Sequence, residues 1–126
     1  MPELNAIGIV SRDLEASARF YRLLGVEVPD PDGDHLEATL GSGVRLMWDA
    51  VSLIKQLEPD WSEPAGGHAI GLAFECASPA DVDAVYARVR DAGYPSKHEP
   101  YDAFWGQRYA TLLDPDGNSV DLFAQL

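Results

Sequence analysis

The chain has 126 residues, an apolar content of 46% and a formal net charge of −12. This length and composition predict one packed globular domain rather than a disordered chain. The negative charge argues against binding to nucleic acid or to an anionic membrane surface, because both carry charge of the same sign. It is compatible with a cationic small-molecule partner or, more simply, with solubility.

The sequence also bears on the environment of the protein. A lone cysteine, Cys76, allows no intramolecular disulfide, and within an apolar run such a residue is most often a small core side chain. The N-terminus lacks the basic-then-apolar pattern of a signal peptide. No apolar run approaches the ~20 residues of a membrane span. We therefore expect a cytoplasmic protein that makes no membrane contact.

The first half of the chain predicts a strand, a helix and three further strands. Apolar residues at both odd and even positions from Leu4 to Val10 are typical of a buried strand. A helix follows, with apolar residues from Leu14 to Leu24 on one face, and Gly25 suits the left-handed position after its last turn. Three strands are expected after it, the last two as a hairpin: 26–28, 35–40 and 44–48.

A connector at 51–67 joins this half to a second copy of the same order. The connector is expected to include a short helix near 51–57, limited by Pro59. In the second copy, Ser78 can cap a helix that begins at Pro79 and ends at Gly93. Strands are expected on either side of this helix: 68–76, a weak one after residue 94, and a hairpin of 108–113 and 119–124.

The two halves are related by a degenerate repeat. The hairpin segments 37–40 and 44–47 return as 109–112 and 120–123. This match places Arg45 and Asp121, which have opposite charges, at equivalent positions. Repeats of this kind indicate two copies of one structural unit, so the repeat predicts an α+β fold of paired βαβββ modules.

The acidic run Asp114–Asn118 begins like a calcium-binding loop. However, Gly117 is its fourth residue rather than the sixth, and Gln125 stands where the bidentate glutamate should be. Aspartate, proline, glycine and asparagine in this order are typical of a turn. We therefore predict a turn and no calcium site.

The order of elements, together with three sequence segments, resembles the vicinal oxygen chelate superfamily. These segments are Ile9–Leu14, Phe20–Gly25 and Asp114–Phe123. The superfamily includes glyoxalase I, extradiol dioxygenases, fosfomycin resistance proteins and bleomycin resistance proteins. The resemblance covers essentially the whole chain and implies a cup-shaped mixed sheet with helices outside, often completed across a homodimer.

The resemblance also implies four positions that hold a divalent metal in the enzymes of the superfamily. In this sequence they fall on Ala6, Arg45, Gly71 and Asp121. Alanine and glycine have no donor side chain, and arginine is a permanent cation. Asp121 alone would hold a metal weakly. We therefore expect neither a metal nor another cofactor.

Arg45 and Asp121 have two open interpretations. If the modules face each other as in the superfamily, both residues project into one cup, where a guanidinium–carboxylate pair would occupy the place of the metal. Such a pair need not add stability, because desolvation offsets the attraction. Alternatively, both residues are ordinary strand charges that point to solvent.

Aromatic residues near the two hairpins are candidate ligand contacts. Phe104 and Trp105 lie in a loop, where function is more common than in a core, and such rings can stack on a flat ligand or bind a cation. Packing at a dimer interface or over the edge of the cup is the alternative. With the two charged positions and Met47, the candidate site is Arg45, Met47, Trp48, His68, Tyr101, Phe104, Trp105, Tyr109 and Asp121.

His68 precedes the second-module metal position by three residues. An unperturbed histidine titrates near neutral pH and can act as a general base. Alternatively, His68 simply caps or lines the start of a strand. His35 and His98 are interpreted as surface or loop residues. No catalytic residues can be assigned from the sequence.

The leading functional interpretation is a metal-free small-molecule binding protein of the bleomycin-resistance type, which sequesters an aromatic or cationic ligand in the cup. The alternative is an enzyme of the same superfamily with an atypical site, either a glyoxalase-like lyase or isomerase or a dioxygenase-type oxidoreductase. A third possibility is a module whose cup merely forms a dimer core. We treat residues 1–126 as a single domain, with a first module at 1–50, the connector at 51–67 and a second module at 68–126, and expect a homodimer.

Overall fold

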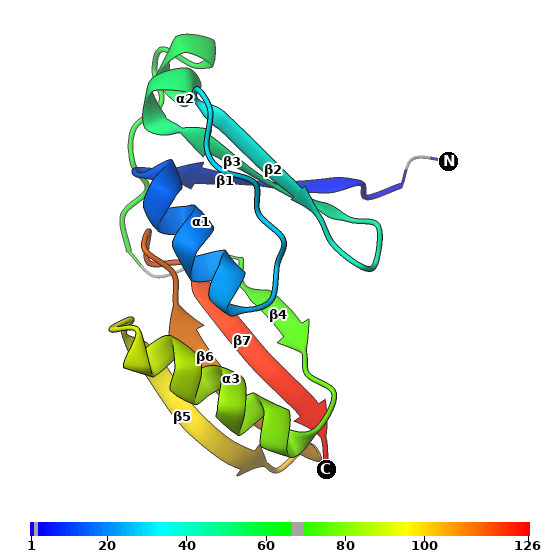
Figure 1. Cartoon of the computed structure of the whole chain (residues 1–126). Helices are drawn as coiled ribbons and strands as arrows, with labels where there is room; N and C mark the ends of the chain where they lie inside the picture. Colours follow the sequence, from blue (N-terminus) through cyan, green and yellow to red (C-terminus); the bar gives the residue numbers. More distant parts are fainter. Residues whose placement is uncertain (2, 67–69) are drawn as a thin grey trace. The chain divides into compact units, whose positions relative to one another are not determined.

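The computed structural model describes residues 1, 3–66 and 70–126. Over these residues the architecture is α+β, with two mixed sheets and three helices, which confirms the predicted fold class (Figure 1). The chain divides into two compact units, Met1–Ala65 and Gly66–Leu126, and this boundary falls within the predicted connector. Within the described ranges, each helix is too short or too polar to span a bilayer.

The first unit contains a three-stranded sheet with β3 in the centre. Strand β3 runs parallel to β1 and antiparallel to β2. The short helix predicted in the connector is confirmed as α2. The elements of this unit are β1 (Ala6–Ser11), α1 (Leu14–Leu23), β2 (His35–Thr39), β3 (Arg45–Ala50) and α2 (Val51–Leu57).

Helix α1 is defined by its caps and by its buried face. The Asp13 carboxylate accepts a hydrogen bond from the amide of Ala16 at 3.2 Å, which satisfies one free donor of the first turn. Gly25 has φ = 89°, as predicted for the residue after the last turn. Tyr21 packs against Trp48 of β3 with ring centroids 5.0 Å apart, so α1 covers one face of the first sheet.

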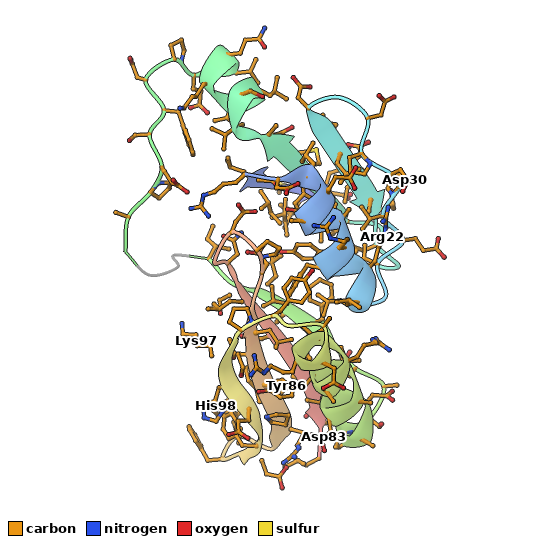
Figure 2. All side chains as sticks on the ribbon, turned by 60° about the vertical axis from the view of Figure 1, so that its left-hand side comes forward. Arg22, Asp30, Asp83, Tyr86, Lys97 and His98 are labelled. Atoms are coloured by element: carbon orange, nitrogen blue, oxygen red, sulfur yellow. The ribbon has the colours of Figure 1, made fainter. Side chains whose placement is uncertain are left out.

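The strand expected from Val26 to Val28 is not formed. The amide of Val26 donates to the carbonyl oxygen of Tyr21 at 3.2 Å, and Arg22 Nε donates to the carbonyl oxygen of Val28 at 3.0 Å. Arg22 also pairs with Asp30 (Figure 2). Helix α1 therefore uses the backbone groups that a strand would need, while both valine side chains are buried.

The second unit contains a four-stranded sheet in the order β4-β7-β6-β5. Its helix begins as predicted, because the Ser78 hydroxyl accepts from the amide of Asp81 at 3.2 Å. Strand β5 is much longer than the weak strand expected after residue 94. The elements are β4 (Leu72–Glu75), α3 (Pro79–Asp91), β5 (Ser96–Ala103), β6 (Gln107–Leu113) and β7 (Ser119–Gln125).

The sheet registers confirm that Arg45 and Asp121 are equivalent. Each residue has a threonine opposite it on the antiparallel neighbour, Thr39 for Arg45 and Thr111 for Asp121. Each also has an alanine beside it on the parallel neighbour. The sequence repeat is therefore a structural repeat at the level of individual residues.

Alternate strand residues form the core of each unit, between the sheet and its long helix. We call the opposite side, turned away from α1 or α3, the far face of the sheet. Polar and aromatic side chains at the remaining positions lie on the two far faces. The buried strand residues include Leu36, Ala38, Leu46 and Trp48 in the first unit and Ala110, Leu112, Val120, Leu122 and Ala124 in the second.

Candidate functional site

The far face of the second sheet is centred on the carboxylate of Asp121. The Tyr109 hydroxyl donates to Asp121 Oδ2 at 2.5 Å, and the Thr111 hydroxyl donates to Oδ1 at 2.8 Å. Both partners are neutral donors. In the described part of the chain, no arginine, lysine or histidine pairs with this carboxylate. Among the described residues of its own unit, this half-buried carboxylate is therefore oriented by neutral hydrogen-bond donors and is not paired with a cation.

The tyrosine of this site remains a proton donor at neutral pH. Burial, and then the hydrogen bond to Asp121 and the charge of that carboxylate, raises the pKa of Tyr109 to about 12. Removing the proton would place a phenolate beside a carboxylate in a partly desolvated position. Tyr109 is thus suited to hold Asp121 in place and unsuited to act as a general base.

A continuous series of aromatic rings begins at Tyr109, which donates to this carboxylate. Trp105 lies edge-on to Tyr109 with centroids 5.4 Å apart, and Tyr109 stacks on Phe123 at 6.3 Å. Tyr101 and Phe104 meet Trp105 at 6.3 and 5.1 Å. We refer to Tyr101, Phe104, Trp105, Tyr109 and Phe123 as the aromatic cluster.

The tip of the β5–β6 hairpin presents the most accessible rings of this cluster. Phe104 is 98% exposed and Trp105 is 47% exposed. The indole of Trp105 is nevertheless fixed, because its Nε1 donates to Gln107 Oε1 at 2.8 Å. An oriented, half-exposed indole that contacts the tyrosine donor of the carboxylate is a suitable surface for a flat or cationic ligand.

The structure brings together several of the residues predicted from the sequence. Tyr101, Phe104, Trp105, Tyr109 and Asp121 all belong to this one site. Sequence reasoning missed Phe123 and Thr111. The alternation of strand β7 was the available signal for Phe123, since it lies two residues beyond Asp121 and so on the same face.

Arg45 lies on the far face of the first sheet, where Asn5 and Glu37 hold its guanidinium. Nε and Nη2 donate to Asn5 Oδ1 at 3.1 and 2.8 Å, and Nη1 donates to Glu37 Oε2 at 2.9 Å. The backbone amide of Arg45 also donates to the Asn5 carbonyl oxygen at 2.9 Å. Arg45 thus has its partners within its own unit, as does Asp121. Met47, two residues along β3, shares this face.

The same network continues to His35, which the sequence interpretation had treated as a surface residue. His35 Nδ1 lies 2.5 Å from Asp49 Oδ1, and Nε2 lies 3.2 Å from Glu37 Oε2. These hydrogen bonds, that to Asp49 most of all, raise the pKa of His35 above its ordinary value of 6.5. Two basic and two acidic side chains therefore alternate across β2 and β3.

This network predicts a pH-dependent contribution to stability. Because the pKa of His35 is raised on folding, its stabilising effect is complete below pH 6.5 and is lost as the pH rises through the folded-state pKa. For exposed groups we expect less than about 1 kcal/mol. Urea unfolding of wild type and His35→Gln from about pH 5.5 to about pH 8.5 should show a difference that shrinks with pH. A difference independent of pH would contradict the assignment.

One of the predicted site residues, Trp48, belongs to the core rather than to either far face. Trp48 was expected to contact ligand, but its side chain is 0% exposed and packs on Tyr21, so it belongs to the core beneath α1. The alternation of β3 places Trp48 on the opposite face from Arg45 and Met47. His68 lies outside the described residues.

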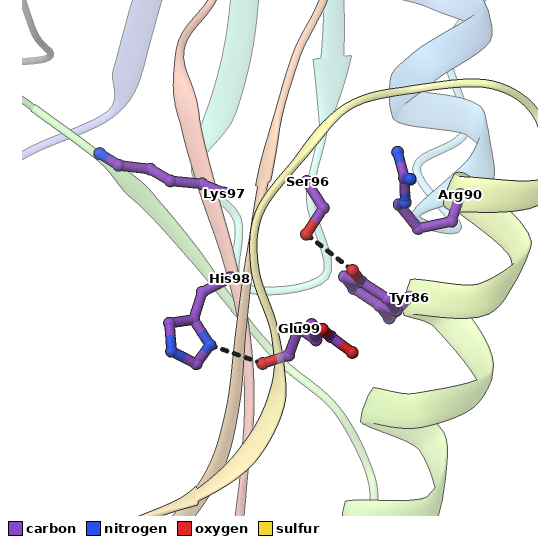
Figure 3. Close-up of a pocket in the computed structure, with 6 residues that line it drawn as sticks. All are labelled: Tyr86, Arg90, Ser96, Lys97, His98 and Glu99. Atoms are coloured by element: carbon purple, nitrogen blue, oxygen red, sulfur yellow. Dashed lines mark hydrogen bonds between the residues drawn. The ribbon is translucent and has the colours of Figure 1, made fainter.

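A separate polar groove lies between α3 and β5, with a volume of about 660 Å³ (Figure 3). The Tyr86 hydroxyl donates to Ser96 Oγ at 2.7 Å across it. Lys97 and His98 project from the other side of β5 in the same view. None of the predicted site residues lines the groove, and its cations do not converge on one point.

The family model of the Glyoxalase/Bleomycin resistance protein/Dioxygenase superfamily matches residues 3–122. The chain therefore belongs to this superfamily, and its α+β fold is of the glyoxalase/bleomycin-resistance type. A search of curated proteins finds no match to the chain.

Solved structures agree with this assignment. A glyoxalase/bleomycin resistance protein/dioxygenase from Nocardioides is 29% identical, with a TM-score of 0.79 over 100% of this chain and 85% of its own. An enzyme of the same family from Burkholderia phytofirmans PsJN is 22% identical, with a TM-score of 0.88 over 99% and 100%. A lactoylglutathione lyase from Agrobacterium tumefaciens is 22% identical, with a TM-score of 0.72 over 97% and 92%. The latter two show a shared fold alone.

The residues present do not fit the metal that the superfamily resemblance implies. The guanidinium of Arg45 occupies one ligand position, and both carboxylate oxygens of Asp121 already accept hydrogen bonds. Ala6 and Gly71 have no donor side chains. Across residues 1, 3–66 and 70–126, no three histidine, cysteine, aspartate or glutamate side chains are arranged to hold a metal ion.

Proposed function

We propose that this protein is a metal-free small-molecule binding protein of the bleomycin-resistance type, which sequesters an aromatic, cationic ligand. One observation carries the proposal: among the described residues the Asp121 carboxylate accepts hydrogen bonds from neutral donors, and one of these donors, Tyr109, belongs to the aromatic cluster. A homodimer and a cytoplasmic location, both expected from the sequence, belong to the same proposal.

The physical chemistry of this site favours a flat cation. A positive charge near Asp121 gains direct electrostatic attraction, and the faces of Trp105 and Tyr109 add cation–π attraction that is stronger where water is excluded. The net charge of −12 also attracts cations at long range. A neutral ring of the same shape gains only the stacking.

The proposal is tested with a cation and a neutral analogue that shares its bicyclic ring. Calorimetric titration near neutral pH compares N-methylquinolinium with quinoline. We expect the wild-type protein to bind the cation at least about tenfold more tightly than quinoline, which corresponds to about 1.4 kcal/mol. Asp121→Asn should remove most of this preference while it leaves quinoline binding unchanged. Trp105→Ala should weaken the binding of both probes.

Two matched variants control for charge and for tryptophan content. Asp91→Asn removes the same charge from an exposed position on α3, and Trp61→Ala removes a tryptophan from the connector. Both should bind N-methylquinolinium as the wild type does. The proposal fails if Asp121→Asn keeps the full preference for the cation, or if Asp91→Asn loses as much.

A further inference from the structure

The donor count of Arg45 points to a second ligand contact, on the far face of the first sheet. A guanidinium has five N–H groups and no acceptor. Asn5 Oδ1 takes one from Nε and one from Nη2, and Glu37 takes one from Nη1. Over the described residues, one N–H therefore remains without a partner on each terminal nitrogen, and 34% of the side-chain surface is exposed.

The surroundings hold this guanidinium in place. Its three hydrogen bonds come from two different segments, the residue before β1 and strand β2. Asn5 is itself fixed, because its carbonyl oxygen accepts from the Arg45 amide. A positioned guanidinium loses little conformational entropy when a ligand binds, which favours recognition of an oxyanion.

Strand β1 leaves space beside Arg45. Ala6 is its direct neighbour on this face, and Gly8 follows two residues later, opposite Met47. Gly8 is exposed, and a methyl group built there would meet no atom within 4 Å. Small residues of β1 thus border this part of the far face, and the flexible thioether of Met47 lies two residues from Arg45 along β3 on the same face.

The local charge balance also differs from that of the whole chain. Glu37 is shared between Arg45 and His35, and Asp49 is engaged by His35. Both neighbouring carboxylates are therefore held by basic side chains. An incoming anion here meets carboxylates that basic side chains already engage, whereas the described residues of the second unit place no cation on the Asp121 carboxylate.

We propose that Arg45 anchors the carboxylate of a small organic acid on the far face of the first sheet. The guanidinium occupies a position where the superfamily resemblance implies a metal ligand, and it offers positive charge and two N–H donors to the oxyanion in place of a metal. The anchor is independent of the cationic-ligand proposal. The Arg45→Met and Asp121→Asn variants separate the two, because each removes one site only.

The test uses benzoate with benzamide as its neutral isostere, by calorimetric titration of the full chain near neutral pH. We expect wild type to bind benzoate at least about tenfold more tightly than benzamide, because hydrogen bonds between charged partners are the stronger ones. Arg45→Met should abolish this preference. Arg45→Lys should keep part of it, since it retains the charge and loses the planar donor geometry.

Two further variants complete the test. Lys55→Met removes one positive charge from the exposed surface of α2 and should bind benzoate as wild type does. Asn5→Ala frees the guanidinium and should weaken benzoate binding several-fold without affecting benzamide. If Arg45→Met does not fold, Arg45→Lys and Asn5→Ala decide the outcome. Unchanged benzoate affinity in these variants, an equal loss in Lys55→Met, or equal binding of the two probes overturns the proposal.

Discussion

Replacing Trp48 with alanine should lower the free energy of unfolding by about 3–5 kcal/mol, as for other large buried aromatic residues. The side chain is fully buried, and its ring lies 5.0 Å from that of Tyr21, so it links the central strand of the first sheet to α1. The loss combines the transfer free energy of the indole with the cavity that remains. Urea unfolding followed by circular dichroism measures it.

Trp48→Phe should be far less damaging. The indole Nε1 is buried and, over the described residues, has no hydrogen-bond partner. Phenylalanine keeps a ring against Tyr21 and leaves a smaller cavity than alanine does. It also removes the buried N–H that has no partner, and this gain partly offsets the free-energy cost of the cavity. Trp61→Ala, at a half-buried position of the connector, is the matched control. A loss below about 1 kcal/mol for Trp48→Ala would contradict its placement in the core.

Replacing Asp114 with alanine should cost about 2–4 kcal/mol, because a buried carboxylate here holds the β6–β7 turn together. Its Oδ1 accepts from the amides of Asp116 at 2.9 Å and Asn118 at 2.8 Å, and Oδ2 accepts from Asn118 Nδ2 at 2.9 Å. Asp114 is only 3% exposed. Urea unfolding followed by circular dichroism measures the loss in the free energy of unfolding.

A conservative variant and a matched variant show how much of the stability loss in Asp114→Ala comes from the hydrogen bonds of its carboxylate. Asp114→Asn keeps an oxygen for both backbone amides and should lose about half as much as the alanine variant. Asp30→Ala removes a carboxylate that is 99% exposed and pairs with Arg22, so it should cost less than about 1 kcal/mol. Equal losses for Asp114→Ala and Asp30→Ala would refute the role of Asp114 in the turn.

The turn around Asp114 illustrates what could be predicted from sequence. Its residue types indicate a turn rather than a calcium loop, and the carboxylate does bind turn amides. The helix caps, the hairpins and the repeat were likewise predictable, because each depends on residues close together in the chain. The absent strand at 26–28 was not, because it depends on Arg22 reaching the carbonyl oxygen of Val28.

The candidate site was predictable to a similar degree. Loop position and residue type identified Phe104 and Trp105, and the repeat identified the equivalence of Arg45 and Asp121. The partners of Arg45 were harder to find, since Asn5 and Glu37 come from different segments and only the strand register brings them together. Strand alternation alone would have separated Trp48 from its neighbours on β3.

The central claim is that the far face around Asp121 and Trp105 binds a flat cation without a metal. Titration of EDTA-treated, metal-free protein with N-methylquinolinium tests this claim most directly. We predict the same affinity before and after EDTA treatment, with no gain when zinc, nickel or iron is restored. Binding that disappears with EDTA and returns with one of these metals would contradict the claim.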